Sequence, residues 1–317
     1  MQAFEEKLAE ARESSWAVHG RRITFYLPGI FLCDGVRGLY PAMSITGTRC
    51  ALNCDHCRRS LLTTMIPAED PATLVEKCLR LKARGALGVL VSGGCDAEGR
   101  LPWEEFLPAV EDVKKTTGLY VSVHSGIVDE ETARGLAEAG VDQALIDVVG
   151  DDGTYHRICH VPFGVERIML AMQHLKDAGI ALAPHIVCGL DYGNIRGEEE
   201  AVHMVSTLRP EQVVIVSYMK IPGTDCERFK LPSAEEVAEV IVNARLSMPN
   251  ARINLGCARE RGNSRIEELA VDAGVNRMAL PSEEAVARAR YYGLEIRYQR
   301  TCCSVSRDFS SKVWIEK

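Results

Sequence analysis

The sequence predicts an α/β protein whose main part is a (β/α)8 barrel of the TIM type, with extensions at both ends. Eight short apolar runs recur along the 317 residues, and the chain between successive runs has room for one helix and two connections. Most runs do not alternate with polar residues, which is typical of parallel strands covered on both faces. One barrel can use the whole length; a doubly wound open sheet is the alternative.

The predicted strands and helices follow one another in regular order. The strands are residues 44–47, 88–91, 119–124, 144–148, 183–188, 213–217, 252–255 and 277–280. Segments with apolar residues at helical spacing lie between or after them, at 71–84, 107–115, 131–139, 165–176, 234–245 and 282–291. Ser282 is the expected N-cap of the last helix. Glycines end several helices, where glycine readily takes the left-handed conformation of a C-cap.

Two segments fall outside this repeat. We therefore divide the chain into an N-terminal extension (1–40), a barrel (41–293) and a C-terminal tail (294–317). The extension contains a polar helix over 4–12 and an extended stretch over 22–27, which we expect to close the barrel bottom or to cover an edge of the sheet. The tail is expected to form one more strand followed by irregular chain.

Charge and hydropathy narrow the range of functions. The formal net charge of −7 argues against a surface that binds nucleic acid. No apolar run approaches the ~20 residues that a transmembrane helix needs, and the acidic N-terminus does not resemble a signal peptide. We therefore expect a soluble cytoplasmic protein without membrane contact. Clustered cysteines among its 12 would then serve metal binding or redox chemistry rather than disulfides.

The strongest functional signal is a cysteine triad. Cys50, Cys54 and Cys57 follow the first predicted strand, at the barrel end where active-site loops lie. Three thiolates at this spacing can each bind a different iron of a [4Fe–4S] cluster, which leaves one iron open for a substrate or cofactor. Structural zinc usually has four ligands, and the sequence near the triad offers only His56 in addition.

This C-x3-C-x2-C spacing resembles the signature of the radical S-adenosylmethionine (SAM) superfamily. The resemblance implies that the open iron chelates the amino and carboxylate groups of SAM. An electron from the reduced cluster, supplied by a donor such as ferredoxin or flavodoxin, would cleave the sulfonium bond. The 5′-deoxyadenosyl radical that is released would abstract hydrogen from an unactivated carbon, while the protein orients the cofactors and excludes water.

The ends of later predicted strands carry the candidate SAM-binding residues, and no residue is assigned a catalytic role. The candidates are Ser92, Gly93, Gly94, His124, Ser125, Asp147 and His185. The first three resemble the superfamily's Gly-Gly-Glu segment, which binds the SAM amino group, with Cys95 where glutamate is usual. We expect Asp147 to pair with His124, because an acid within an apolar strand needs a partner. An ordinary glycine turn and hydrogen-bonded core residues are the alternatives.

A second, auxiliary [4Fe–4S] cluster would give a sulfur-inserting radical enzyme its sulfur. The candidate ligands are Cys33, Cys257, Cys302 and Cys303, with Ser304 as a substitute for Cys33. Cys257 ends the seventh predicted strand and so should face the same barrel mouth as the triad. The adjacent pair can share one cluster if the chain bends there. Unrelated thiols are the alternative.

Over nearly the whole barrel the pattern resembles the biotin-synthase-like branch of the superfamily and, within it, a subunit of the split, two-protein lipoyl synthases. The matching stretches lie at 25–29, 44–57, 90–94, 123–129, 183–190, 255–259 and in the late Cys-Cys pair. This resemblance implies sulfur insertion into an octanoyl chain on a lysine of a lipoyl carrier domain, with a second radical SAM subunit as partner. Single-chain lipoyl synthases carry their auxiliary cysteines in one N-terminal motif, which this chain lacks.

Two other readings stay open. The first is another enzyme of this branch, such as a biotin synthase or a mutase that acts on a small substrate. The second is a non-catalytic iron–sulfur or zinc protein, which would have a filled coordination shell and would not bind SAM.

Overall fold

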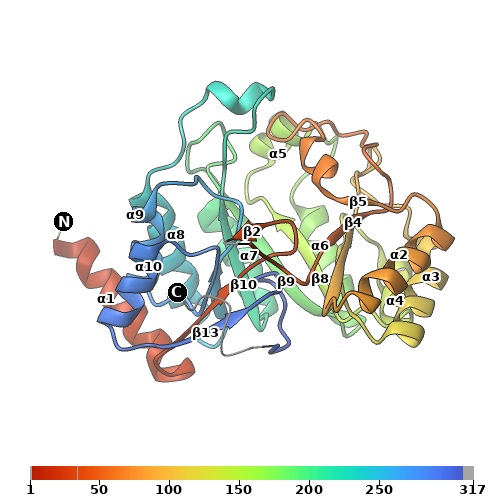
Figure 1. Cartoon of the computed structure of the whole chain (residues 1–317). Helices are drawn as coiled ribbons and strands as arrows, with labels where there is room; N and C mark the ends of the chain where they lie inside the picture. Colours follow the sequence, from red (N-terminus) through yellow and green to blue (C-terminus); the bar gives the residue numbers. More distant parts are fainter. Residues whose placement is uncertain (1, 34, 310–317) are drawn as a thin grey trace.

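One curved parallel sheet with helices around it forms most of the molecule (Figure 1). The computed structural model describes residues 2–33 and 35–309. Eight strands that follow one another in space as in sequence form the barrel wall, and each pairs in parallel with its neighbours. They are β4 (Ala42–Ser44), β6 (Gly88–Ser92), β7 (Tyr120–His124), β8 (Gln143–Val148), β9 (Ala181–Cys188), β10 (Gln212–Ser217), β11 (Arg252–Leu255) and β12 (Arg277–Ala279). The predicted α/β barrel fold is confirmed.

Every predicted barrel strand overlaps an observed one, but the first is displaced. Residues 44–47 were expected to be a strand, whereas β4 ends at Ser44. The chain turns immediately afterwards: the Ser44 hydroxyl donates to the carbonyl of Gly47 at 2.6 Å, and Gly47 has a φ of +61°. The short strand β5 (Ile66–Pro67) then pairs with β4 and forms one edge of the sheet.

Ten α-helices are present among the described residues. They are α1 (Gln2–His19), α2 (Pro71–Ala83), α3 (Trp103–Thr117), α4 (Glu130–Glu138), α5 (Asp152–Cys159), α6 (Glu166–Asp177), α7 (Glu198–Leu208), α8 (Ala234–Ser247), α9 (Ser264–Asp272) and α10 (Glu283–Tyr291). All six helices predicted in the barrel are found, and Ser282 caps α10 by accepting a hydrogen bond from the amide of Ala285 at 3.2 Å. The prediction missed α5, α7 and α9. α7 begins after Gly197 and so lacks the usual start signal; Asn263 precedes α9 but makes no side-chain N-cap bond.

The extended stretch of the N-terminal extension lies inside the sheet. It forms β1 (Arg22–Tyr26), which pairs with β12 on one side and with β13 (Glu295–Gln299) on the other. This stretch therefore covers the edge of β12, which is one of the two placements expected from the sequence, and the sequence did not show that β13 would cover it in turn. Both its backbone edges are used, and β13 takes the edge position. The hairpin of β2 (Leu32–Cys33) and β3 (Val36–Arg37) follows it.

The helix of the extension is longer than predicted and packs on the outside of the barrel. The Ser15 hydroxyl of α1 donates to the carbonyl of Gly274 at 2.6 Å, and Arg12 donates to the carbonyl of Asp272 at 2.8 Å. Both bonds tie α1 to the end of α9. The domain limits at residues 40 and 293 stay a prediction, and the part of the predicted tail beyond residue 309 lies outside the described residues.

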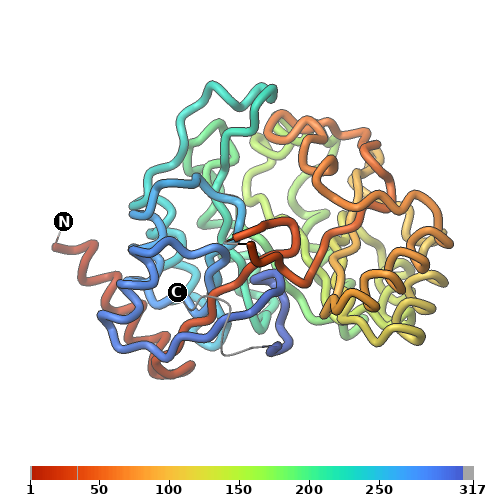
Figure 2. The backbone as a smooth tube through the Cα atoms, in the orientation of Figure 1, coloured from red at the N-terminus to blue at the C-terminus, as the bar shows by residue number. Residues whose placement is uncertain are grey.

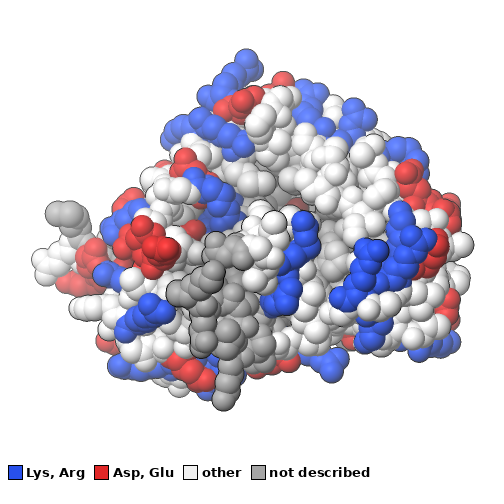
Figure 3. All heavy atoms as spheres, in the orientation of Figure 1, with Lys and Arg blue, Asp and Glu red and all other residues white. Residues whose placement is uncertain are grey.

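Lys and Arg side chains are interspersed with Asp and Glu over the face of the molecule shown in Figure 3. Within residues 2–33 and 35–309, no helix has both the length and the hydropathy of a membrane span.

Candidate active site

A cavity of about 400 Å³ opens at the carboxyl ends of the barrel strands, within the size range of small-molecule sites. It collects most of the residues that the sequence singles out. These are Cys50, Cys54, Cys57, Ser92, Gly93, Gly94, His124, Asp147, His185, Cys257, Cys302 and Cys303. Ser125 and Cys33 are not among the lining residues. Ser125 is buried and its hydroxyl donates to the carbonyl of Gly126 at 3.0 Å; Cys33 lies in the β2–β3 hairpin.

The loop that carries the triad is bent so that its three thiols face this one cavity. Asn53, Arg58 and Arg59 adopt positive φ angles of 48°, 44° and 65°, a conformation that costs side-chain-bearing residues roughly 1–2 kcal/mol each. Two hydrogen bonds fix the loop from outside: Ala51 donates to the carbonyl of Cys95 at 2.7 Å, and Asp55 to the carbonyl of Ile158 at 2.9 Å. The fold therefore holds a strained loop in the shape that brings the cysteines together.

Neighbouring cysteines and burial raise the pKa values of Cys54 and Cys57. A hydrogen bond with Cys54, together with burial, raises the pKa of Cys57 to about 12, and contact with Cys159 raises the pKa of Cys54 well above its usual range. Neighbouring thiolates repel one another unless a cation lies between them, and metal binding displaces the thiol protons. The donor set therefore fits an iron–sulfur cluster that binds all three sulfurs.

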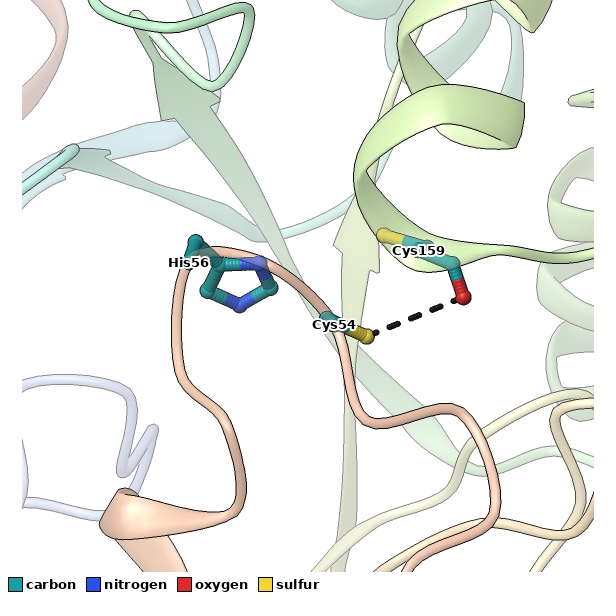
Figure 4. Close-up of side chains that lie close together, drawn as sticks. All are labelled: Cys54, His56 and Cys159. Atoms are coloured by element: carbon teal, nitrogen blue, oxygen red, sulfur yellow. Dashed lines mark hydrogen bonds between the residues drawn. The ribbon is translucent and has the colours of Figure 1, made fainter. Parts of the chain in front are cut away.

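The structure adds one cysteine that the sequence left unassigned. Cys159, at the end of α5, lies beside Cys54, whose thiol is 3.9 Å from the Cys159 carbonyl oxygen (Figure 4). One ligand atom each from Cys54, His56 and Cys159 lie within 4.8 Å of one another. The Nδ1 atom of His56 is buried without a hydrogen-bond partner among the described residues. These groups offer zinc three of its usual four ligands, so the zinc reading needs its own test.

Replacing Cys159 by serine distinguishes the two metals. We expect the variant, reconstituted without oxygen, to bind as much iron per chain as the wild type, because the triad alone binds the cluster. A zinc site would instead lose one of its thiolates, and its zinc content would fall. Elemental analysis of both metals in the same samples measures the difference; a loss of zinc at constant iron would favour the zinc protein.

Close backbone contact explains Gly94, the second of the two glycines that follow β6. A Cβ atom added to Gly94 would lie 2.0 Å from the carbonyl oxygen of Arg49 and 2.4 Å from the Cβ of Cys50. The amide of Gly94 donates to the Thr46 hydroxyl at 2.6 Å. Gly94 thus lies directly against the first cysteine of the triad, where only glycine fits.

The Gly94→Ala variant should therefore lose its cluster. The added methyl group cannot be accommodated unless the backbone at Cys50 moves, and we expect less than half of the wild-type iron after reconstitution. Gly118→Ala is the matched control: Gly118 also has no side chain to lose, but nothing lies within 4 Å of its added Cβ. Its positive φ costs about 1–2 kcal/mol without touching the site. Equal iron in both variants would contradict this account.

A histidine–carboxylate pair faces the cavity from β7 and β8. The Nε2 atom of His124 lies 3.5 Å from a carboxylate oxygen of Asp147, the partner expected from the sequence. The side chain of Asp147 is 54% exposed because it projects into the cavity. Burial would raise the pKa of Asp147, but the charge and hydrogen bond of His124 outweigh it and lower that pKa to about 2. At His124, burial would lower the pKa, but the charge of Asp147 and the hydrogen bond with it outweigh burial and raise the pKa above its ordinary value.

The neighbouring His185 stays neutral. Its ring centroid lies 6.1 Å from that of His124. Burial lowers its pKa to about 4, and its Nδ1 atom is 2.9 Å from the carbonyl oxygen of Ala183, to which it can donate. At neutral pH the cavity therefore presents a carboxylate acceptor at Asp147 beside an uncharged imidazole.

In the iron-free protein, we expect the contributions of His124 and Asp147 to stability to depend on pH in opposite ways. The contribution of His124 to stability is complete below its unfolded pKa of 6.5 and is lost as the pH rises through the higher folded value. That of Asp147 is complete above about pH 4 and is lost as the pH falls towards 2. NMR titration should place the His124 midpoint above 6.5, and Asp147→Asn should lower it. An unchanged midpoint in that variant would show that the pair does not interact.

The three late cysteines lie together and line the same cavity as the triad. Cys303 packs in the barrel interior with Val214, Val216 and Ala279, and Cys257 and Cys302 contact the same group. Hydrogen bonds lower the pKa of Cys302 below its ordinary range. The bond with Cys303 has the largest effect, and bonds with Ser304 add to it. The Ser304 hydroxyl lies 3.1 Å from its sulfur. A thiolate is the form in which cysteine binds metal.

The loop of Cys257 is clamped by Arg259. The sequence leaves three hypotheses for Arg259 and Arg261: they tune a cluster, bind an acidic substrate, or lie on a solvated face. Arg259 is fully buried, and its guanidinium donates to Glu267 at 2.6 Å and to the carbonyl of Ala279 at 2.7 Å. It is therefore neither solvated nor free for a substrate. Arg261 donates to the carbonyl of Cys257 at 2.6 Å.

Comparison with known proteins agrees with this geometry. Residues 44–205 match the sequence model of the Radical SAM superfamily, and residues 199–312 match that of the Biotin and Thiamin Synthesis associated domain. A biotin synthase of Halorhodospira halophila is 26% identical over 247 residues, which cover 75% of this chain and 74% of that protein. A biotin synthase of Burkholderia cenocepacia (strain HI2424) is 27% identical over 248 residues, covering 74% of this chain and 70% of that protein.

Solved structures share the fold. Methylornithine synthase (PylB) superposes with a TM-score of 0.66 at 19% identity, over 93% of this chain and 89% of that one. HydG, a maturase of the [FeFe]-hydrogenase, gives 0.67 at 15% identity, over 93% of this chain and 68% of that one.

These matches identify the superfamily and bear on the alternative functions that the sequence left open. The superfamily model spans more than half of the 317 residues. The cofactors of this superfamily are a [4Fe–4S] cluster and SAM, as the sequence predicts for this chain. The relatives favour the biotin-synthase-like alternative over the split lipoyl synthases. The chain belongs to the radical SAM superfamily.

Proposed function

We propose that this protein is a radical SAM enzyme that inserts sulfur into an aliphatic carbon, as a biotin-synthase-like enzyme would. One observation carries the proposal: the triad and the three late cysteines line the same cavity. When bound, the first cluster supplies the electron that cleaves SAM. A sulfur source in the same cavity lets a carbon radical meet sulfur without leaving it, and the enclosed site keeps water and competing reactants away.

Each wall of the cavity has its own task in this proposal. Cys50, Cys54 and Cys57 hold the SAM-cleaving cluster. The 92–94 segment, Asp147 and the neighbouring histidines bind SAM, with the Asp147 carboxylate accepting hydrogen bonds from its hydroxyl or amino groups. Cys257, Cys302 and Cys303 hold an auxiliary cluster, and a fourth ligand from Cys33 or Ser304 belongs to the same proposal.

The rest of the lining suits an aliphatic substrate. Apolar side chains from several loops face the cavity, namely Leu52, Leu61, Leu62, Met65, Ile127, Ile146, Val149, Leu190, Val216, Met219 and Ile221. Uncharged side chains also predominate in the upper middle of the face shown in Figure 3. Such a surface binds an alkyl chain by burying its apolar area, and a few polar groups then fix its orientation.

A second candidate substrate is an octanoyl chain on a lipoyl carrier domain, with a second radical SAM subunit as partner. One observation favours this substrate. Three of the stretches that resemble the split lipoyl synthases supply cysteines that line the cavity, namely residues 44–57, residues 255–259 and the late Cys-Cys pair. For either substrate we propose a ferredoxin or flavodoxin as electron donor. Cysteines that cluster to bind metal, as we propose for this chain, are typical of a reducing compartment, and we propose a cytoplasmic location.

The test is turnover by the anaerobically reconstituted, reduced protein. We expect about eight irons per chain, since each cubane carries four, and 5′-deoxyadenosine formed from SAM. Mass spectrometry of dethiobiotin and of an octanoylated lipoyl-domain peptide, each with and without a candidate second subunit, identifies the carbon chain that gains sulfur. SAM cleavage with about four irons and no sulfur in either product would favour a mutase instead. An absence of SAM cleavage would overturn the proposal.

A further inference from the structure

The chain that follows β13 enters the interior of the barrel. Four successive main-chain carbonyls of this tail each accept a hydrogen bond from a side chain of the barrel wall. The bonds are Asn254 Nδ2 to Cys303 O (3.3 Å), Gln212 Nε2 to Ser304 O, Arg277 Nη1 to Val305 O (2.7 Å) and Arg277 Nη2 to Ser306 O (3.2 Å). Figure 2 shows the tail, in dark blue, between the two sides of the molecule.

The three donors form one network on adjacent strands. Gln212 and Arg277 are the first residues of β10 and β12, and Asn254 of β11 pairs in register with Arg277. The Gln212 side-chain oxygen accepts from Arg277 at 2.7 Å and from Asn254 at 3.4 Å. Branched apolar side chains usually fill this part of a barrel. Here a polar layer takes their place, and its donors point at the tail.

The tail continues to the opposite wall. The amide of Ser306 donates to the Gln143 side chain of β8 at 3.1 Å, and its hydroxyl is 2.8 Å from that of Tyr120 on β7. Val305 packs with Tyr40 and Tyr120 in a buried cluster. The segment from Cys303 to Ser306 therefore crosses the barrel from the β10–β12 side to the β7–β8 side.

The network and the tail satisfy each other's buried polar groups. Arg277 is only 6% exposed and Gln212 and Asn254 are fully buried, so each would be left with unpaired groups if the tail withdrew. An unsatisfied buried polar group costs about 1–3 kcal/mol, and a charged one costs more. These bonds involve no metal. They hold Cys302 and Cys303, at the start of the same segment, against the cavity that Cys257 lines.

We propose that Gln212, Asn254 and Arg277 are positioning residues that anchor the tail inside the barrel and so keep Cys302 and Cys303 in place beside Cys257 before any metal binds. The inference rests on the proposed function only for what these cysteines bind. In that function, an auxiliary cluster that gives up sulfur is lost in turnover, and a ligand set that stays in place can be loaded again.

The experiment compares full-length variants of Arg277 with a buried arginine elsewhere. Arg277→Met removes both tail bonds, and Arg277→Lys keeps a donor. Arg245→Met is the control, because Arg245 is fully buried in α8 and donates to the carbonyl of Ala251 and to the side chain of Asn276, next to Arg277, whereas the four tail carbonyls accept from other residues. The first readout is amide hydrogen exchange of the 300–309 region in iron-free protein. We expect at least tenfold faster exchange there in Arg277→Met, partial rescue in Arg277→Lys and no local change in Arg245→Met.

The second readout is iron and SAM cleavage after reconstitution. We expect Arg277→Met to bind about four irons where the wild type binds about eight, and to cleave SAM at the wild-type rate. Unchanged exchange of the tail in Arg277→Met would overturn the inference. Should that variant not fold, Gln212→Leu, which removes one tail bond and no charge, takes its place under the same criteria. A wild type with only about four irons would refute the auxiliary cluster, while the exchange data would still test the anchoring.

Discussion

Replacement of Cys54 by alanine abolishes SAM cleavage: we expect 5′-deoxyadenosine to fall to the level of the iron-free protein. Cys54 is the most buried of the three triad cysteines, and the loop around it is held in a strained shape by its outward bonds. Two thiolates do not hold a cubane as three do, and without the open iron of that cluster SAM is not held where an electron can reach its sulfonium. Product analysis by chromatography, with iron counted in the same samples, measures the effect.

The matched control for this variant is Cys78→Ala. Cys78 is a fully buried cysteine of α2 whose thiol lies 3.6 Å from the sulfur of Met43, and it does not line the cavity. Its loss removes a small buried side chain and should cost about 1 kcal/mol of stability without changing iron or SAM cleavage. Wild-type SAM cleavage by Cys54→Ala would mean that another ligand, with Cys159 the nearest candidate, replaces it and that the triad is not the essential set.

Local patterns were enough to predict the barrel. Parallel strands buried on both faces have to be apolar without alternation, and each of the eight predicted runs overlaps a strand. Helices with a clear apolar spacing, such as α2 and α8, were also found from the sequence. What failed depended on distant contacts: β1 lies inside the sheet because residues more than 250 positions later pair with it on both sides.

In the candidate site too, local motifs could be predicted from the sequence, whereas contacts between distant residues could not. The triad and the glycine segment are short motifs, and the pairing of His124 with Asp147 follows from the cost of burying a lone acid. By contrast, nothing near Cys159 in the sequence shows that it lies beside Cys54, and Arg259 looks like a surface charge until Glu267 is placed next to it. The anchoring of the tail likewise joins side chains to carbonyls that are 28 to 92 residues away. Contacts of this kind exist only in the folded chain.

Replacing Cys303 by alanine should separate the two halves of the proposed chemistry. We expect SAM cleavage within about twofold of the wild type, because the triad and the 92–94 segment are left unchanged, and sulfur insertion below detection. The reason is positional. Cys303 is buried at the centre of the group that Cys257 and Cys302 join, so its loss removes the ligand that connects the other two. Cys302→Ala should behave alike, because its thiol carries the lowered pKa of a thiolate ligand.

Cys188→Ala serves as the control for this second pair of variants. Cys188 ends β9, is fully buried and does not line the cavity, so it reports the general cost of deleting a core thiol. Iron should fall by about half in Cys303→Ala, from about eight to about four per chain, and should stay constant in Cys188→Ala. Mass spectrometry of the substrate after turnover then decides the matter: a product that still gains sulfur in Cys303→Ala, with iron unchanged, would show that the late cysteines hold no sulfur source, and the radical formed at the triad would have to serve another reaction.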